Sequence, residues 1–243
     1  MVELTPRQKQ ILKCLIEEYI DTGAPVGSET LEKKYELGVS PATIRNEMAR
    51  LTQMGFLTQP HTSAGRIPTS LALKFYIKNL MEERDLSVAD EVAIKERIWD
   101  HRFEVQKLLK EAVSTLADRT KNLAVAYTNQ GDVFHAGYAH ILDAPEFYDI
   151  DVTRTVLSLL DETNRLAQIF SQAVGEEPVH LLFGEELGID FLQPVAFIFT
   201  SFATGQKLSG SLGIIAPCRC PYPQTIPIVR YFGQLISEIS KNW

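Results

Sequence analysis

The most restrictive feature of the sequence is a helix-start signal that recurs within its first eighty residues. Thr5 precedes Pro6, and Ser40 precedes Pro41. A hydroxyl side chain can cap a helix and proline suits the first helical position, so each pair predicts a helix start. Gln8 completes a capping box in the first of them. With the apolar spacing that follows, we expect helices from Pro6 to Gly23, from a Ser28 cap over a short stretch, and from Pro41 to about Gly55.

The stretch after the third helix predicts a β-hairpin and a fourth helix. Phe56–Pro60 and Arg66–Pro68 are short extended runs around a small polar tip. Thr69 can then cap the fourth helix. Two helices joined by a glycine-containing turn form a helix-turn-helix, and a hairpin directly after the second helix is a wing. Residues 1–80 are therefore predicted to form a winged-helix DNA-binding domain.

The third helix divides into two unlike faces. Ile44, Met48 and Leu51 fall in a narrow arc and should face the core. The opposite arc is small and polar, as a helix that enters the major groove requires, although an ordinary solvated face looks similar; the neighbouring hairpin favours DNA. We predict base contacts from Thr43, Asn46 and Arg50. The further candidate DNA-binding residues are Ser40, Arg45, Gln53, Ser63 and Arg66, of which the two arginines are expected at phosphates or in wing contacts.

The charge of the chain is unevenly distributed. The formal net charge is −7, which argues against a nucleic-acid partner for the chain as a whole. Residues 1–80, however, hold ten Lys/Arg and eight Asp/Glu, a net of +2, which leaves −9 for the rest. Within residues 40–80, five basic residues face a single acid, Glu47. This asymmetry favours a basic binding module joined to an acidic body.

Four stretches of this sequence closely resemble the heat-inducible transcription repressor family HrcA. They are Leu4–Gln8, Tyr19–Ser28, Val39–Met48 and Ser63–Thr69. The resemblance is dense over residues 4–80 and thinner towards the end. It implies a homodimer that binds an inverted-repeat operator, called CIRCE, in double-stranded DNA upstream of chaperone operons. It also implies a GroEL-type chaperonin that keeps the repressor active, and loss of repression on heating.

The acidic remainder predicts helices and mostly antiparallel strands. Residues 81–121 should form a linker with one or two long helices from Asp90 to about Lys121, which either pack on their own domain or form a dimer helix. Residues 122–243 should form a sheet with helices on one face, giving the α+β class overall. The expected elements are strands at 123–127, from 133, 179–183, 195–202 and 211–216, and helices at 153–173 and 225–240.

For residues 122–243 the HrcA resemblance implies more specifically a GAF-like domain. Typical family members carry an inserted segment associated with dimerisation. The path from Tyr127 to Asp143 is too short to hold it. We therefore expect a trimmed domain, whose dimer geometry need not follow that of the family.

Catalytic chemistry finds no support in the sequence. Phosphate-loop, G-x-S-x-G, H-E-x-x-H and Rossmann glycine motifs do not occur, so we predict neither an enzyme nor a cofactor. Cys218 and Cys220 could ligate a metal or form a redox pair, but two ligands are too few for a structural zinc site, and no metal is predicted. A catalytic body with an accessory DNA module would need a polar constellation that the sequence does not reveal.

The expected location is the cytoplasm. No apolar run approaches the roughly 20 residues of a membrane span, and no signal peptide opens the sequence. Three cysteines fit a reducing compartment. The main alternative to a heat-controlled repressor is an effector-sensing regulator, whose GAF-like domain binds a small molecule and releases DNA.

Overall fold

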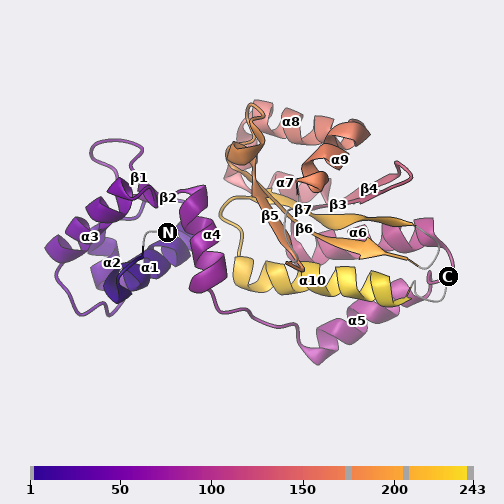
Figure 1. The fold of residues 1–243 in the computed structure, drawn as a ribbon, viewed down its shortest axis with the longest axis horizontal. Coiled ribbons are helices and arrows are strands. Elements are labelled where there is room, and N and C mark those ends of the chain that lie inside the picture. Colours follow the sequence, from indigo (N-terminus) through magenta and orange to yellow (C-terminus); the bar gives the residue numbers. More distant parts are fainter. Residues whose placement is uncertain (1–2, 173–176, 205–207, 240–243) are drawn as a thin grey trace. The chain divides into compact units, whose positions relative to one another are not determined.

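The computed structural model describes residues 3–172, 177–204 and 208–239. The chain forms two compact units (Figure 1). The first comprises the residues up to Glu82 together with Pro221–Pro223, and the second comprises Glu83–Cys220 and the residues from Gln224 on. Each unit has its own buried apolar core.

The first unit has the order of elements predicted for a winged helix. Three helices come first, then a two-stranded antiparallel hairpin, then a fourth helix. In chain order these are α1 (Pro6–Thr22), α2 (Ser28–Lys34), α3 (Pro41–Gln53), β1 (Leu57–Thr58), β2 (Ile67–Pro68) and α4 (Ser70–Asn79). The predicted hairpin is confirmed, with strands shorter than the extended runs suggested.

The helix starts follow the predicted local chemistry, with one exception. The Thr5 hydroxyl and the Gln8 side chain form a complete capping box on α1. Ser40 and Thr69 each accept a hydrogen bond from a backbone N–H in the first turn of α3 and α4. The prediction that Ser28 caps α2 is wrong: Gly27 is the N-cap, and Ser28 is the first helical residue, with its side chain buried.

The second unit is built on a five-stranded antiparallel sheet of order β4-β3-β7-β6-β5. The strands are β3 (Leu123–Thr128), β4 (Val133–Ala136), β5 (His180–Phe183), β6 (Val195–Ala203) and β7 (Ser209–Pro217). The helices are α5 (Val88–Trp99), α6 (Val105–Thr120), α7 (Tyr138–Ile141), α8 (Ile150–Asp161), α9 (Thr163–Ser171) and α10 (Tyr222–Ile239), with short 3-10 turns η1 (Pro145–Tyr148) and η2 (Gly184–Leu187). The predicted α+β class and antiparallel sheet are confirmed.

Helices cover both faces of this sheet, so the expectation of helices on one face is wrong (Figure 1). On one face, Val125 and Phe197 share an apolar cluster with residues of α8 and α9. On the other face, α10 lies so close to β6 that a Cβ added at Gly233 would meet Thr200 Cγ2 at 2.4 Å. The physical reason is that β3 and β6 are apolar on both sides, as strands buried between two layers are.

The helix expected over residues 153–173 is also corrected. The structure has two helices there, α8 and α9, and they meet at Glu162, whose φ of −99° and ψ of 72° are not helical. The break falls in the four polar residues 161–164, which supply no apolar contact to hold a continuous helix. The expected end at Ala173 lies outside the described residues. In the linker, the structure has two helices, α5 and α6.

Candidate nucleic-acid interface

Helix α3 presents to solvent the face predicted to meet DNA. Ile44, Met48 and Leu51 are buried against the rest of the unit, as predicted. On the opposite arc, Thr43 is half-buried, and four residues are exposed: Arg45, Asn46, Arg50 and Gln53. Within the described part of the chain, no hydrogen bond or ion pair occupies the side chains of Arg45, Asn46 and Gln53. Their donors and acceptors are thus free for a partner.

Arg50 is oriented by a buried carboxylate that the sequence analysis treated only as an isolated acid. Arg50 Nη1 lies 3.2 Å from Glu47 Oε1, and Gln8 Nε2 donates to Glu47 Oε2 at 3.0 Å. Gln8 Oε1 in turn accepts from the Thr5 N–H in the capping box. The side chain of Arg50 nevertheless remains 63% exposed. The network therefore ties α3 to the start of α1 while leaving most of the guanidinium available.

Ser40 and Thr43 lie together at the start of α3. Ser40 Oγ accepts from the Thr43 N–H at 3.3 Å, and the two hydroxyls are 3.1 Å apart. Ser40 therefore has a structural role as a cap, with its own side chain exposed. The free N–H groups of a helix start favour an anion such as phosphate in their vicinity.

The wing is held in place by interactions that the sequence did not reveal. Gln59 Nε2 donates to the carbonyl oxygens of Thr62 at 2.8 Å and Ala64 at 3.0 Å. The backbones of Val26 and Arg66 exchange two hydrogen bonds, of 2.9 and 2.8 Å. The Gln59 bonds close the loop within the hairpin, and the Val26–Arg66 bonds fix the hairpin to the segment between α1 and α2.

Arg66 lies at the base of the wing as predicted, but its side chain turns inward. Arg66 Nε donates to Thr52 Oγ1 on α3 at 3.2 Å, and the residue is half-buried. The neighbouring Gly65 is packed so closely that a Cβ would lie 2.4 Å from Val26 O. Ser63, by contrast, is exposed at the tip. The structure thus separates a supporting arginine from an available serine.

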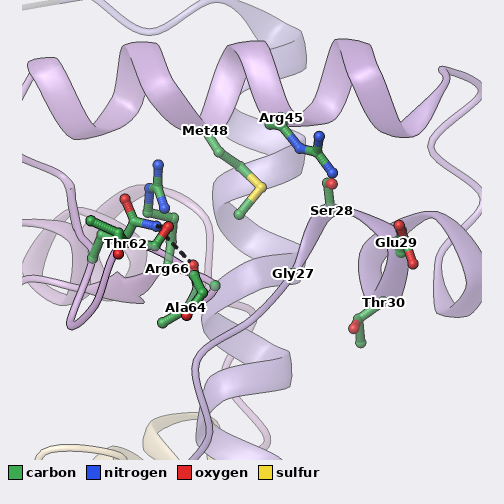
Figure 2. Close-up of a pocket in the computed structure, with 12 residues that line it drawn as sticks. Gly27, Ser28, Glu29, Thr30, Arg45, Met48, Thr62, Ala64 and Arg66 are labelled. Carbon is green, nitrogen blue, oxygen red and sulfur yellow. Dashed lines mark hydrogen bonds between the residues drawn. The ribbon is translucent and has the colours of Figure 1, made fainter.

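A polar groove of about 560 Å³ brings several predicted residues together (Figure 2). Figure 2 shows Arg45 beside Ser28 on one side of the groove and the wing residues Thr62 and Ala64 on the other. Ser63 and Arg66 also line it. Asn46, Arg50 and Gln53 do not line the groove and lie on the open face of α3. The predicted residues therefore form an exposed helix face with a groove at its edge.

Two family models match this chain. The model described as "Winged helix-turn-helix transcription repressor, HrcA DNA-binding" matches residues 3–82, and the model described as "HrcA protein C terminal domain" matches residues 69–226. The chain belongs to the HrcA family. The first unit is thus the DNA-binding domain of an HrcA protein, and the resemblance identified from the sequence is confirmed.

Relatives in the HrcA family align along almost the whole chain. The heat-inducible transcription repressor HrcA of Symbiobacterium thermophilum is 26% identical over 335 aligned positions, which include 97% of this chain and 98% of the relative. The protein of the same name from Chloroflexus aggregans is 27% identical over 348 positions, covering 97% and 93%. Both alignments are longer than the 243 residues of this chain, so these HrcA relatives contain segments without a counterpart here.

A solved structure has the same fold. It is titled "Crystal structure of a hypothetical protein at 2.2 A resolution", and it covers 99% of both chains with a TM-score of 0.78 and 19% identity. The arrangement of a winged helix followed by an antiparallel sheet with helices is therefore shared along the full length of an independent structure.

Cys218 and Cys220 of this HrcA protein are poorly suited to act together as metal ligands or as a redox pair. Cys220 Sγ donates to Thr225 Oγ1, and burial raises the pKa of its thiol to about 12. Burial and nearby carboxylates, Glu146 first, also raise the pKa of Cys218. Thiolates are the reactive and metal-binding form, and both thiols stay protonated at neutral pH. Within the described ranges, no three His, Cys, Asp or Glu side chains gather as metal ligands would.

Among the described helices of this HrcA protein, none combines the length and apolar character that crossing a bilayer requires. The effector-sensing alternative stays a prediction.

Proposed function

We propose that this HrcA protein represses transcription by occupying an operator with α3 in the major groove. The observation that carries the proposal is the pair of opposite faces on α3: Ile44 and Leu51 are buried, while Asn46 and Arg50 are exposed on a face of small polar residues. A recognition helix needs such a face, because bulk would keep it out of the groove. The mechanism is steric, since bound protein blocks transcription.

Individual residues have distinct roles in this proposal. Thr43, Asn46 and Arg50 contact base edges, because they lie on the exposed arc of α3 and carry donors and acceptors. The second group positions the domain on the sugar-phosphate backbone or at its margin; it consists of Ser40, Arg45, Gln53 and Ser63. Arg66 supports the wing through Thr52, and any phosphate contact would come from the guanidinium nitrogens not bonded there.

The operator in this proposal is an inverted repeat of the CIRCE type, bound by a homodimer. A two-fold symmetric site is matched by two copies of the same recognition helix related by a two-fold axis. Support comes from the family resemblance over residues 4–80 and from the family model for residues 3–82. The acidic second unit would repel the phosphate backbone, which favours docking through the winged helix.

Heat control is the second part of the proposal. The protein works in the cytoplasm, carries out no catalytic step, and depends on a GroEL-type chaperonin to return to its active state. Because the chain lacks segments present in its HrcA relatives, its dimer interface is small, and warming separates or misfolds the subunits. Light scattering across the range of growth temperatures tests this proposal. A dimer that stays intact and binds DNA well above those temperatures would contradict it.

The direct test of DNA recognition is a gel-shift titration with an inverted-repeat operator. Asn46→Ala and Arg50→Ala should each weaken binding by about 1–3 kcal/mol and relax specificity at one base pair. A matched control for Arg50 is Arg154→Ala, since Arg154 is 66% exposed and also pairs with an acid three residues away. Asn164→Ala on α9 serves the same purpose for Asn46. Unchanged operator affinity in both α3 variants would show that α3 is not the recognition helix.

A further inference from the structure

Helix α5 carries apolar residues on two separate sides. Ile94 and Ile98 are fully buried against the second unit. On the other side, Val88 is 77% exposed, and Val92 and Trp99 are also exposed. The apolar stripe of a helix normally packs against another surface, so this second apolar side of α5 has the composition of a covered surface.

The exposed apolar residues lie along one strip of the helix. At 100° per residue, Val88, Val92 and Trp99 fall within about 40° of one another. Phe103, just beyond the helix, is 78% exposed. We call this strip the outer face of α5; its exposed members are Val88, Ala89, Val92, Ala93, Glu96 and Trp99. The two alanines at its edge would allow close approach of another helix.

Charged groups border the outer face in an ordered way. Lys95 Nζ lies 5.7 Å from the centroid of the Trp99 ring and 3.4 Å from Glu238 Oε1 on α10, and the Arg102 guanidinium lies 5.1 Å from the same ring. Arg102 also stacks on Phe103 at 4.4 Å. Glu96 has no ion-pair partner in the part of the chain that the structure describes. The strip therefore has positive charge beside its aromatic end and an unpaired carboxylate near its middle.

We infer that the outer face of α5 binds the outer face of α5 in a second copy of this chain, with the two helices antiparallel. The pairing follows from one register: a two-fold axis between positions 95 and 96 sets Val88 against Phe103 of the other copy. The same register sets Val92 against Trp99, and Lys95 against Glu96. Each apolar residue thus meets an apolar one. The two-fold axis repeats the contact of Lys95 with Glu96, so two pairs of opposite charges form.

Charge complementarity selects this occupant and this direction. In a parallel pair, Glu96 would face Glu96 and Lys95 would face Lys95, which repels. The antiparallel register removes both conflicts and gives Glu96 a partner. The inference rests on the homodimer of the proposed function and specifies which surface forms it.

The first test uses the full-length protein in sedimentation equilibrium. Val92→Glu places a charge in the centre of the apolar strip and should raise the dimer dissociation constant at least tenfold. Ile150→Glu is the matched control, because Ile150 is an exposed aliphatic residue on α8. Far-UV circular dichroism verifies folding of both variants. A Val92→Glu protein as dimeric as wild type, or equal dissociation by Ile150→Glu, would overturn the inference.

The second test reverses the two central charges. Lys95→Glu and Glu96→Lys should each weaken the homodimer by about threefold to tenfold, since each sets like charges against each other. Because Lys95 also pairs with Glu238 within the chain, far-UV circular dichroism verifies the folding of the Lys95→Glu variant. An equimolar mixture of the two variants should dimerise more strongly than either alone, because the mixed pair has opposite charges at both positions. If the mixture dimerises no more strongly than either variant alone, the antiparallel register is wrong.

Operator binding separates this inference from the proposed function. If the inference and the function both hold, Val92→Glu binds a single half-site like wild type but loses affinity for the full inverted repeat. If Val92→Glu stays dimeric and binds the full operator normally, the inference fails and the function stands. If the wild-type protein does not bind the operator while Val92→Glu still dissociates the dimer, the proposed function fails and the inference stands.

Discussion

Helices α3 and α5 are built alike on their inner sides. They have 13 and 12 residues, and each is preceded by an N-cap serine whose hydroxyl accepts a hydrogen bond from a backbone N–H. Each buries isoleucine without residual exposure: Ile44 in α3, and Ile94 and Ile98 in α5. The chemistry that makes each segment a helix and attaches it to its unit is therefore the same.

Their outer sides differ. The exposed face of α3 presents amide and guanidinium groups at Asn46 and Arg50, whereas that of α5 presents Val92 and Trp99. Exposed polar groups suit base edges and phosphates, and exposed apolar groups suit another apolar surface. The inner face thus governs folding, while the outer face determines the class of partner.

The largest expected effect falls on the shared inner sides. Ile44→Ala and Ile98→Ala should each lower the free energy of unfolding of their unit by about 2–5 kcal/mol, since each leaves a cavity in a packed core. Urea denaturation of the full-length variants measures the loss. A loss below 1 kcal/mol at Ile98 would mean that α5 is only loosely attached, and the likeness of the two inner faces would fail.

The next effect separates the outer sides by their response to salt. Arg45→Ala should weaken binding to all DNA sequences alike and reduce the slope of log affinity against log salt by about one. The control is Arg102→Ala, because Arg102 stacks on the aromatic end of the α5 strip. Titration of a single half-site at several salt concentrations gives the slopes. An equal change of slope in both variants would remove the distinction between the two surfaces.

A smaller and equal effect is expected at the two caps. Ser40→Ala and Ser87→Ala each remove the hydroxyl that accepts the first-turn N–H. Each should cost about 1 kcal/mol of stability, whatever the helix later binds. Thermal denaturation of both variants provides the measurement, and Ser63→Ala, at the exposed tip of the wing, is the control. A cost confined to one helix would show that the starts are not equivalent.

Local chemistry in the first unit was predictable from sequence because its determinants are neighbours in the chain. The capping box of Thr5 and Gln8 spans three residues and needed no tertiary information. The contact of Gln8 with Glu47 joins residues 39 positions apart, so no local pattern could reveal it. The inward turn of Arg66 towards Thr52 was missed for the same reason.

In the second unit, two apolar patterns in the sequence indicate features of the fold that the sequence analysis did not predict. The run from Leu123 to Ala126 is apolar without alternation, which indicates burial on both faces of the strand and hence helices on both sides of the sheet. The spacing of Val88, Val92 and Trp99 likewise marks a second apolar side on α5. What the sequence could not supply was that Ile94 and Ile98 take the inner side and leave this strip exposed.

The smallest effect distinguishes the two helix starts by pH. At the start of α5, hydrogen bonds from Ser87 and an ion pair with Arg119 hold the pKa of Asp90 below its usual range. A lowered pKa stabilises the fold above the unfolded-state value of about 3.9, and this contribution disappears as the pH falls through the folded-state pKa. Asp90→Asn should therefore be slightly less stable than wild type at pH 7, and the difference should vanish in acid.

The start of α3 pairs Ser40 with Thr43 and has no such acid, so the Ser40→Ala loss should be the same at every pH. Urea unfolding from pH 7 down to pH 3 at low salt measures both, and a pH-independent Asp90→Asn difference would contradict the assignment.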